Sequence, residues 1–294
     1  MNKRILVVGD VMTDVIVLPE GPVVKGSDRR ARIRQRPGGS GANQAVWLGV
    51  LGADVTFAGR VGIADIERWD AYFTARGVRP ALTADAEQPS GMLVTIVDAD
   101  GERSFLTDRG ANLNLSRADL PDALLDGMAV LAVSGYSLFA PRPRAAVTDL
   151  MARAGARDIT IAVDPASVGF IEEVGASTFL GWAAGAGLIL ANADEARALT
   201  GLAGTAAQMR ALGAHFATVV IKCGAQGAVL GDAGGIRLEL PAPNVAVVDS
   251  TGAGDAFAAG FLKAFCEGAG EAAALQAGIA AGARAVGSIG GQPA

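Results

Sequence analysis

The stretch "VVDSTGAGDAFAAGFLKAF", Val247–Phe265, contains the residues that decide both the fold and the chemistry of this chain. A β-branched run leads into a segment with two glycines, then Asp255, then an almost unbroken apolar run. Glycines permit a tight turn that gathers backbone N–H groups, and the amino terminus of a helix attracts anions through its dipole. The stretch therefore predicts a loop that becomes a buried helix, with a carboxylate at the junction.

Such a junction favours phosphoryl transfer. The helix dipole stabilises a first-turn carboxylate by about 0.3–1 kcal/mol, which keeps Asp255 ionised and able to take a proton from a hydroxyl group. The N–H groups of the turn would hold the phosphoryl oxygens. A purely structural interpretation is equally open at this point: Asp255 caps the helix while Gly252 and Gly254 only turn the chain.

The rest of the chain alternates short apolar strands with helical patterns. Arg4–Asp10 resembles a buried parallel strand, and Asn43–Gly52 has apolar residues at helical spacing. The alternation continues through "DVTFAGRVG", "MAVLAVSG", "PRAAVTDLMARAG", "DITIAVDPA", "GLILANADEARALTG" and "TVVIKCGAQGAVL". This order predicts an α/β fold with a largely parallel sheet, formed by residues 1–294 as one domain.

Two segments, about 15–36 and 92–108, interrupt this rhythm. The second is typical of a β-hairpin with "DADGE" as its turn. The first contains "RRARIRQR", whose arginines at 30, 32, 34 and 36 would share one face of an extended strand. We expect the two segments to pair into a small antiparallel sheet, a lid over the carboxyl ends of the parallel strands, where open α/β sheets bind ligands.

Composition narrows the classes of function. The 294 residues include 25 basic and 30 acidic side chains, for a net charge of −5. The chain therefore lacks the overall positive charge that is typical of proteins that bind nucleic acid. Cys223, Cys266 and the single His215 are too few for a disulfide framework, a zinc cage or a histidine triad. Asp10 and Asp14 interrupt the first apolar run, and no other run suits a membrane span, so we expect a soluble cytoplasmic protein.

Two nucleotide-binding motifs are excluded. The chain has no G-x-x-x-x-G-K-[ST] sequence, which excludes a Walker P-loop. "GAGDAFAAG" lacks the G-x-G-x-x-G spacing and lies late in the chain, which argues against a dinucleotide fold.

Three further motifs carry candidate ligand contacts. In "PGGSGANQAVWLGVLG", Asn43 opens a helix, where it can cap the helix or bind a polyol hydroxyl. Asp10 and Asp14 follow the first strand, where carboxylates can bind sugar hydroxyls. Asn192 and Glu195 stand one helical turn apart after a strand and can organise a hydrated Mg²⁺ ion, although an ordinary acidic helix start has the same pattern.

Taken in order, these motifs resemble the ribokinase family of carbohydrate kinases, also called the phosphofructokinase-B family. "GGSGANQAVWLGVLGADVTFAGRVG" is similar to the amino-terminal signature of the family and "VDSTGAGDAFAAGFL" to its carboxyl-terminal signature. "NADE", "KCGAQGAVL" and the ending "GGQPA" also match. The resemblance implies a three-layer αβα sandwich with a mainly parallel central sheet and a small antiparallel β lid.

The resemblance also implies catalytic roles. Asp255 would be the general base on a primary hydroxyl, and the backbone amides of Gly252, Ala253 and Gly254 would form the anion hole. The resemblance implies ATP and Mg²⁺ as requirements, and Asp249 matches a residue of the monovalent-cation site in potassium-activated members, which adds K⁺ as a candidate activator.

The binding residues follow in the same way. Those for the substrate are Asp14, Gly39 and Asn43, with Arg103 and Arg109 as candidates on the lid. Those for the nucleotide are Asn192, Lys222, Gly224 and Gly227, with Glu195 reaching Mg²⁺ through water.

Two departures argue against ribose as the substrate. Ser40 replaces the lysine that ribokinase has in "GGKGAN", and Gly135 and Tyr136 stand where ribokinase has a substrate-binding glutamate. Arg103, Arg109 and the arginine row would suit an anionic substituent. The same arginines also suit a solvated lid whose edge strand is protected from aggregation.

The expected function is ATP-dependent phosphorylation of a hydroxymethyl group of a sugar. A nucleoside kinase, or a kinase for a sugar acid or sugar phosphate, remains an alternative, as does a non-catalytic sugar or nucleotide sensor on the same fold. Pairing of two lids into a homodimer is a further expectation, because an exposed sheet edge accepts another strand.

Overall fold

The computed structural model describes residues 3–98, 100 and 102–293. Nine strands of this part form one sheet in the order β13-β12-β11-β10-β9-β8-β1-β4-β5. They are β1 (Arg4–Val8), β4 (Asp54–Gly62), β5 (Val78–Asp85), β8 (Met128–Ser134), β9 (Thr160–Asp164), β10 (Leu188–Asn192), β11 (Thr218–Lys222), β12 (Ala228–Asp232) and β13 (Gly235–Leu240). The pairs from β5 to β11 are parallel and only those with β12 and β13 are antiparallel, which confirms the predicted sheet.

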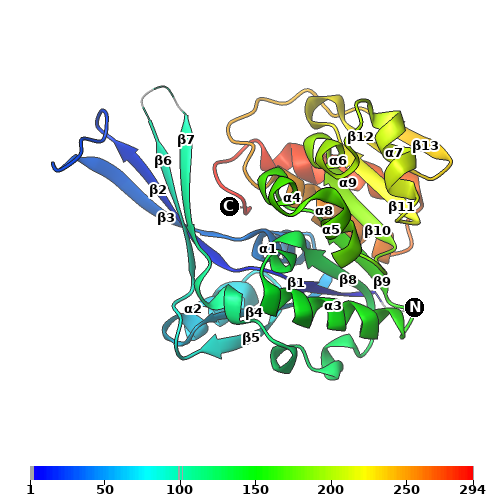
Figure 1. The fold of residues 1–294 in the computed structure, drawn as a ribbon, viewed down its shortest axis with the longest axis horizontal. Helices are drawn as coiled ribbons and strands as arrows, with labels where there is room; N and C mark the ends of the chain where they lie inside the picture. The colour runs from blue at the N-terminus through cyan, green and yellow to red at the C-terminus, as the bar shows by residue number, and fades with distance from the viewer. Residues whose placement is uncertain (1–2, 99, 101, 294) are drawn as a thin grey trace.

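Helices cover both faces of this sheet (Figure 1). On one face lie α1 (Ser40–Val50), α2 (Ile66–Thr74), α8 (Ala253–Cys266) and α9 (Glu271–Ala285). On the other lie α3 (Pro141–Gly155), α4 (Val168–Val174), α5 (Ala176–Trp182), α6 (Ala193–Thr200) and α7 (Thr205–Gly213). Short 3₁₀ turns connect them: η1 (Ile63–Asp65), η2 (Gly110–Asn114), η3 (Arg117–Asp119), η4 (Asp122–Leu125), η5 (Gly135–Leu138) and η6 (Gly224–Gln226).

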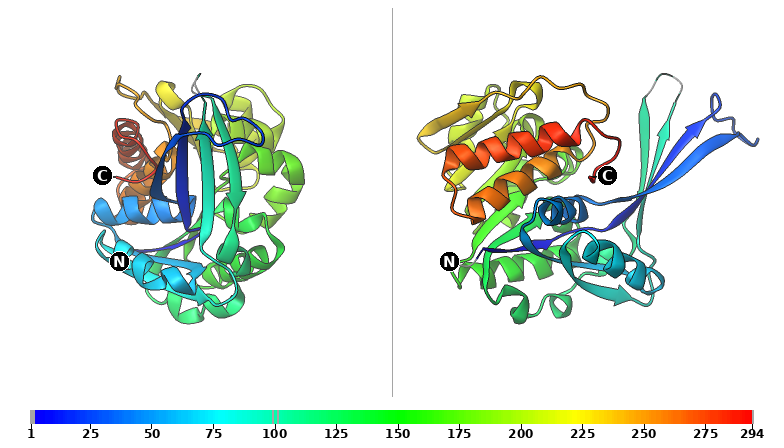
Figure 2. Two further views of the ribbon diagram at one scale, coloured as in Figure 1. Left: turned by 90° about the vertical axis from the view of Figure 1, so that its left-hand side faces the viewer. Right: turned by 180° about the vertical axis from the view of Figure 1, so that it is seen from behind.

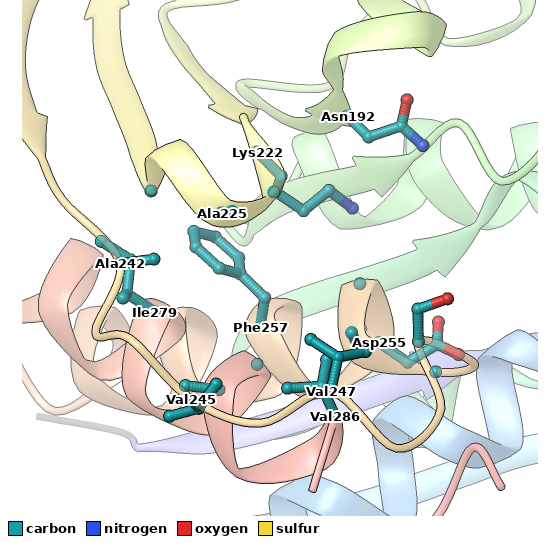
Figure 3. Close-up of a pocket in the computed structure, with 18 of the residues that line it drawn as sticks. Asn192, Lys222, Ala225, Ala242, Val245, Val247, Asp255, Phe257, Ile279 and Val286 are labelled. Carbon is teal, nitrogen blue, oxygen red and sulfur yellow. The ribbon is translucent and has the colours of Figure 1, made fainter. Parts of the chain in front are cut away.

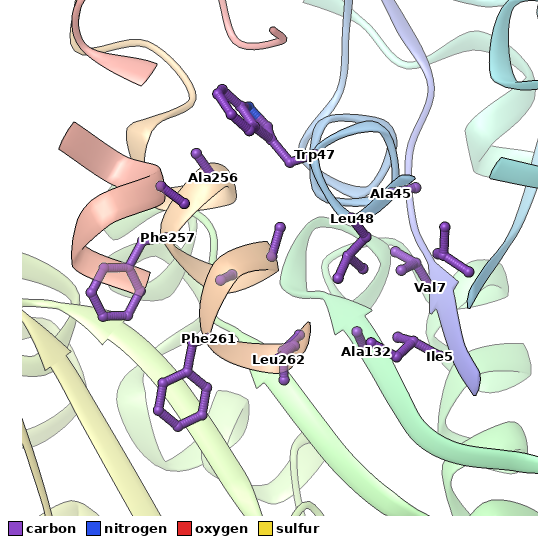
Figure 4. Close-up of a cluster of buried hydrophobic side chains, with 14 of the residues drawn as sticks. Ile5, Val7, Ala45, Trp47, Leu48, Ala132, Ala256, Phe257, Phe261 and Leu262 are labelled. Atoms are coloured by element: carbon purple, nitrogen blue, oxygen red, sulfur yellow. The ribbon is translucent and has the colours of Figure 1, made fainter. Parts of the chain in front are cut away.

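The central strand β1 explains why two helical layers are needed. Successive side chains of a strand point to opposite faces of the sheet. Ile5 and Val7 belong to the core under α1 and α8, whereas Leu6 and Val8 belong to the core on the other side. Figure 4 shows the first core, where side chains of α1 and α8 meet those of β1 and β8. Both faces of β1 are apolar, so each must be covered.

A second sheet of four strands extends away from this body (Figures 1 and 2). Its order is β3-β2-β6-β7, with β2 (Met12–Pro19), β3 (Ala31–Gly38), β6 (Gly91–Val97) and β7 (Arg103–Asp108). These strands fall in the two segments that the sequence assigned to a lid. The outer pairs are antiparallel as predicted, but the central pair, β2 with β6, is parallel, because both strands leave the body in the same direction.

The register separates the two faces of this lid. The strand pairs place Asp14 beside Arg36, and Ile16 beside Arg34, on one face. That face is directed toward the body of the protein, as shown by the hydrogen bond that the Arg36 guanidinium donates to the main-chain carbonyl of Ile289. The other face, called here the apolar lid face, is made of Val15, Val17, Ile33, Met92, Val94, Ile96 and Leu106. The predicted alternation of arginines along β3 is therefore confirmed.

No helix in the described part of the chain is long and apolar enough to cross a membrane.

Candidate functional site

A cavity of about 710 Å³ opens at the carboxyl ends of the parallel strands. The ends of β9, β10 and β11 form one wall, and the amino terminus of α8 faces them (Figure 3). Phe257, Ile279 and Val286 supply an apolar wall together with Ala242 and Val245 of the loop before α8. A cavity with one apolar end and one end lined by backbone N–H groups and charges suits a nucleotide.

Asp255 lies in the first turn of α8, where this cavity meets α1. The Ser40 hydroxyl donates to its Oδ1 at 2.7 Å, and the Asn43 amide donates to its Oδ2 at 2.9 Å. Burial, and secondly the charge of Asp164, raise the pKa of Asp255, the bonds from Asn43 and Ser40 lower it, and the balance of these effects leaves the pKa at about 7. A carboxylate with this pKa is poised to accept a proton near neutral pH.

The prediction that Asn43 opens its helix is wrong. Helix α1 begins at Ser40 after Gly39, so Asn43 lies one turn inside it and turns its side chain to Asp255 instead of capping. Gly39 has a φ of 94°, and a side chain there would meet the Asp10 carbonyl oxygen at 2.5 Å. Only glycine suits that position, which lets the chain pass from the lid directly into α1.

The glycine turn before Asp255 opens α8 as expected. Gly252 is left-handed, with a φ of 72°, and precedes the first helical residue, Ala253. First-turn N–H groups of a helix have no partner within the helix, although Ala253 N–H also makes a 3.3 Å bond to the Ser250 carbonyl. A Cβ on Gly254 would lie 3.4 Å from Nζ of Lys222, which places an ammonium beside this turn. Positive charge and backbone donors thus meet at one end of the cavity.

Lys222, at the end of β11, forms an ion pair with Asp164, at the end of β9, at 2.9 Å. Burial would lower the pKa of Lys222, but the charges of Asp164 and Glu195 outweigh it and leave the pKa above its usual value. The lysine therefore stays charged beside the α8 turn. Sequence reasoning missed Asp164, although its place after a buried strand could have indicated it.

Asn192 and Glu195 form a reciprocal cap at the start of α6. The Glu195 N–H donates to the Asn192 side chain at 2.8 Å, and the Asn192 N–H donates to the Glu195 carboxylate at 2.7 Å. Both side chains still line the cavity, and burial raises the pKa of Glu195 to about 7. Among the residues that the structure describes, no group of three or more potential protein ligands could hold a metal ion.

Asp14 is a buried acceptor on the body-facing side of the lid. Its Oδ1 has no hydrogen-bond partner within the described part of the chain. Burial, and secondly the charge of Asp10, raise the pKa of Asp14 to about 6. Buried carboxylate oxygens without a donor are rare, and the hydroxyl groups of a polyol would supply one. This geometry suits the substrate role predicted for Asp14.

Arg109 is engaged by groups of its own chain. Its guanidinium pairs with the buried Asp10 at 3.2 Å and lies 4.2 Å from the ring centroid of Tyr136. The same side chains border a second cavity of about 170 Å³, whose walls include Phe139 and Phe170. Tyr136 also lines the first cavity, so the two adjoin at its ring. The side chain of Arg103, the other arginine proposed on the lid, lies outside the described part of the structure.

The remaining predicted residues frame the site. Gly224 and Gly227 line the cavity in the turn from β11 to β12, with left-handed φ values of 59° and 100°. Asp249 lies behind the α8 turn, where its Oδ1 accepts from the Thr251 hydroxyl at 2.7 Å and its Oδ2 accepts from Gly290 N–H at 3.0 Å. The structure thus brings together all the predicted nucleotide residues at one cavity, whereas Arg109 lines the second cavity and Asp14 lies on the lid.

An α/β sandwich with a carboxylate at a glycine-rich helix start suits phosphoryl transfer. Residues 2–294 match the model of the pfkB family of carbohydrate kinases. An aminoimidazole riboside kinase from Salmonella typhimurium is 31% identical over 89% of this chain and 80% of its own. A ribokinase from Bacillus subtilis is 30% identical over 99% of this chain and 95% of its own.

Solved structures agree. A Salmonella enterica aminoimidazole riboside kinase, in complex with its riboside and an ATP analogue, has a TM-score of 0.79 and 27% identity over 99% of this chain and 96% of its own. A Sinorhizobium meliloti adenosine kinase has a TM-score of 0.88 over 100% of this chain and 96% of its own, at 22% identity, which shows the shared fold. This chain belongs to the pfkB family and is a phosphotransferase with an alcohol group as acceptor.

Proposed function

We propose that this protein transfers the γ-phosphoryl group of ATP to a hydroxymethyl group of a sugar or a sugar-containing nucleoside, with Asp255 as the general base. The observation that carries the proposal is the set of groups at one end of the cavity: a half-buried carboxylate with a pKa near 7, the start of α8 and the Lys222 ammonium. A base, an anion hole and a cation at one point are what phosphoryl transfer requires.

In the proposed reaction, Asp255 takes the proton of the substrate hydroxyl. The resulting oxygen forms a bond to the γ-phosphorus while the bond from that phosphorus to the bridging oxygen breaks, and ADP leaves with the electron pair. The amides of Gly252, Ala253 and Gly254 and the charge of Lys222 stabilise the phosphoryl oxygens. The proton on Asp255 leaves to solvent or to product.

Asn192 and Glu195 would hold Mg²⁺ through water, since Mg²⁺ retains water and takes its other ligands from nucleotide phosphates. When bound, Mg²⁺ supplies charge neutralisation on those phosphates. Potassium would act near Asp249, behind the anion hole, and dependence on K⁺ is measured directly in the assay below.

The substrate class is narrowed by the neighbourhood of Arg109. Its charge is already neutralised by Asp10, which weakens the case for a sugar acid or sugar phosphate at this point. The second cavity, with Tyr136, Phe139 and Phe170 in its walls, favours a planar apolar substituent on the sugar. A nucleoside or other riboside is therefore the second candidate, in agreement with the names of two of the similar proteins.

A homodimer through the lid is part of the proposal. The apolar lid face exposes Ile33, Met92 and Leu106 by 62%, 42% and 63% of their surfaces. A sheet face with this much exposed apolar surface suits a second copy of itself, and pairing of the two faces would bury it. Light scattering would test this directly, and a monomer would overturn it.

The test of the function is an ADP-release assay with Mg²⁺–ATP, with and without K⁺. The panel contains pentoses, ketohexoses, sugar acids, sugar phosphates and nucleosides, and Asp255→Asn is the control. A substrate phosphorylated by the native chain and not by the variant supports the proposal. Ligand binding without turnover by the native chain would favour a sensor instead.

A further inference from the structure

The segment Ser288–Pro293 reaches the catalytic carboxylate from behind. The Trp47 indole donates to the Gly291 carbonyl at 3.0 Å, and the Gly290 N–H donates to Asp249 at 3.0 Å. A Cβ on Gly291 would lie 2.6 Å from Nδ2 of Asn43, and one on Gly252 would lie 2.4 Å from the Gly291 Cα. The segment therefore passes between α1 and the start of α8 with room for glycine alone.

This passage brings Gln292 to Asn43. The Gln292 amide donates from Nε2 to Oδ1 of Asn43 at 2.9 Å, and Oε1 of Gln292 accepts from the Tyr72 hydroxyl of α2. Asn43 in turn donates from Nδ2 to Asp255 at 2.9 Å. Three side chains from α2, the 288–293 segment and α1 thus form a single hydrogen-bonded chain that ends on the carboxylate.

The Asp255 carboxylate fixes which way the amides of this hydrogen-bond series face. An ionised carboxylate can only accept, so Asn43 must present its NH₂ group to Asp255 and its carbonyl to Gln292. Gln292 must then present its NH₂ group to Asn43, which leaves its carbonyl for the Tyr72 hydroxyl. Reversal of any one amide would set two acceptors or two donors against each other. Gln292 therefore holds the Asn43 amide in the one orientation that supports an ionised base.

We propose that Gln292 is a positioning residue for catalysis, which acts through Asn43 to keep Asp255 ionised. Tyr72 is the far end of this series of hydrogen bonds. The inference rests on the proposed role of Asp255. Other groups that face Asp255 are Asp164 and Lys222 from the opposite strands, Ser40 and Gln44 from α1, and Tyr136 after β8. None of them makes a described hydrogen bond to Gln292, so a change at Gln292 reaches the base through Asn43.

The test is Gln292→Met, which keeps the length of the side chain and removes both of its polar groups. Without a partner for its carbonyl, the Asn43 amide is free to turn, and the carboxylate loses part of its stabilisation. The acid limb of kcat should shift upward by about 0.5–1 pH unit. Turnover near pH 7 should therefore fall about 2–5-fold and return toward the native value at pH 9, with an unchanged KM for ATP. Tyr72→Phe should shift the limb in the same direction by less.

Gln208→Met is the matched control. Gln208 is buried and, like Gln292, donates its amide to a carbonyl oxygen, here the main-chain carbonyl of Leu202 at 2.9 Å, but it lies in α7. It should lower the melting temperature by a similar amount and leave the acid limb in place. An equal loss of kcat by Gln292→Met at every pH, with no shift of the limb, would show a merely structural role and overturn the inference. Retained turnover in Asp255→Asn would instead overturn the proposed function itself.

Discussion

The junction of α1 with α8 and the lid sheet are built in opposite ways. At the junction, Ser40 and Asn43 donate to Asp255, and glycines bring the 288–293 segment into direct backbone contact. On the lid, Asp14 has an oxygen without a partner in the described structure, and the apolar face is open. The difference is that the polar groups around Asp255 are satisfied within the chain, whereas the lid has an acceptor and an apolar surface that the described part of the chain leaves without a partner.

The sharpest test of the junction is Asp255→Asn. Loss of a general base should lower kcat by about 10²–10⁴-fold, with nucleotide affinity within a few-fold, as measured by ADP release and by titration calorimetry. In the native protein, kcat should decrease as the pH is lowered through about 7, because Asp255 then takes up a proton. Substantial turnover in the variant would show that Asp255 is not the general base and that the junction of α1 with α8 is not the catalytic centre.

The same variant should gain stability. The pKa of Asp255 is higher in the folded chain than in the unfolded chain, so its contribution to stability is present below about pH 4 and is lost as pH rises through about 7. At pH 8 the native protein carries the cost of a buried charge that asparagine lacks, and Ser40 can rotate its hydroxyl to accept from the new amide. We expect the melting temperature to rise by about 2–5 °C at pH 8, and the gain to vanish near pH 4.

Lys222→Met tests the other side of the cavity. The substitution removes a charge from the phosphoryl site and leaves Asp164 buried without its partner. We expect kcat to fall about 10²-fold and the free energy of unfolding to fall by about 3–5 kcal/mol. Adding Asp164→Asn should restore most of the stability in urea denaturation but not the turnover. Recovery of both would mean that Lys222 serves only the fold.

Asp14→Asn tests the open acceptor of the lid. A hydrogen bond to a charged acceptor is worth roughly 1.5–3 kcal/mol, so KM for the hydroxyl substrate should rise about 10–100-fold, with less change in kcat and none in KM for ATP. The kcat/KM of the native protein should also decrease at pH values below about 6, where Asp14 takes up a proton. The Asp14→Asn variant should not show this decrease. A native KM in the variant would place substrate recognition elsewhere.

The smallest expected effect on catalysis comes from Leu106→Glu, on the edge strand β7 of the apolar lid face, where Leu106 exposes 63% of its surface. A charge there should convert a dimer to a monomer in light scattering while kcat stays within about threefold, because the residue points away from Asp14. Thr107→Glu, on the opposite face of the same strand, is the matched control and should leave the dimer intact. Dissociation by both variants would argue against the apolar face as the interface.

The fold was predictable from sequence because its signals are local. Buried strands such as Ile5–Val8 and glycine stops define the alternation, and the parallel sheet follows from it. The base and the glycine turn were also predictable, since they are adjacent in the chain. The pairing of β2 with β6 was not, because parallel pairing of residues 79 positions apart in the chain has no local signature.

Contacts between residues far apart in the chain could not be predicted from the sequence for the same reason. The Lys222–Asp164 pair, the Arg109–Asp10 pair and the Gln292–Asn43 bond each join positions that only the folded sheet brings together. Asn43 illustrates the limit. Its residue type favoured a helix cap, and only the position of Gly39 as the true cap shows that its amide is available to Asp255.

The placement of α1 and α8 also has a consequence for synthesis. The two helices pack together, and Trp47 and Leu48 are buried in the core that they share (Figure 4). Roughly two hundred residues separate them in the chain, which at about 5–20 residues per second amounts to about 10–40 s on the ribosome. During that interval the side of α1 that packs on α8 has no cover, so its apolar surface exposes the nascent chain to aggregation until α8 has emerged.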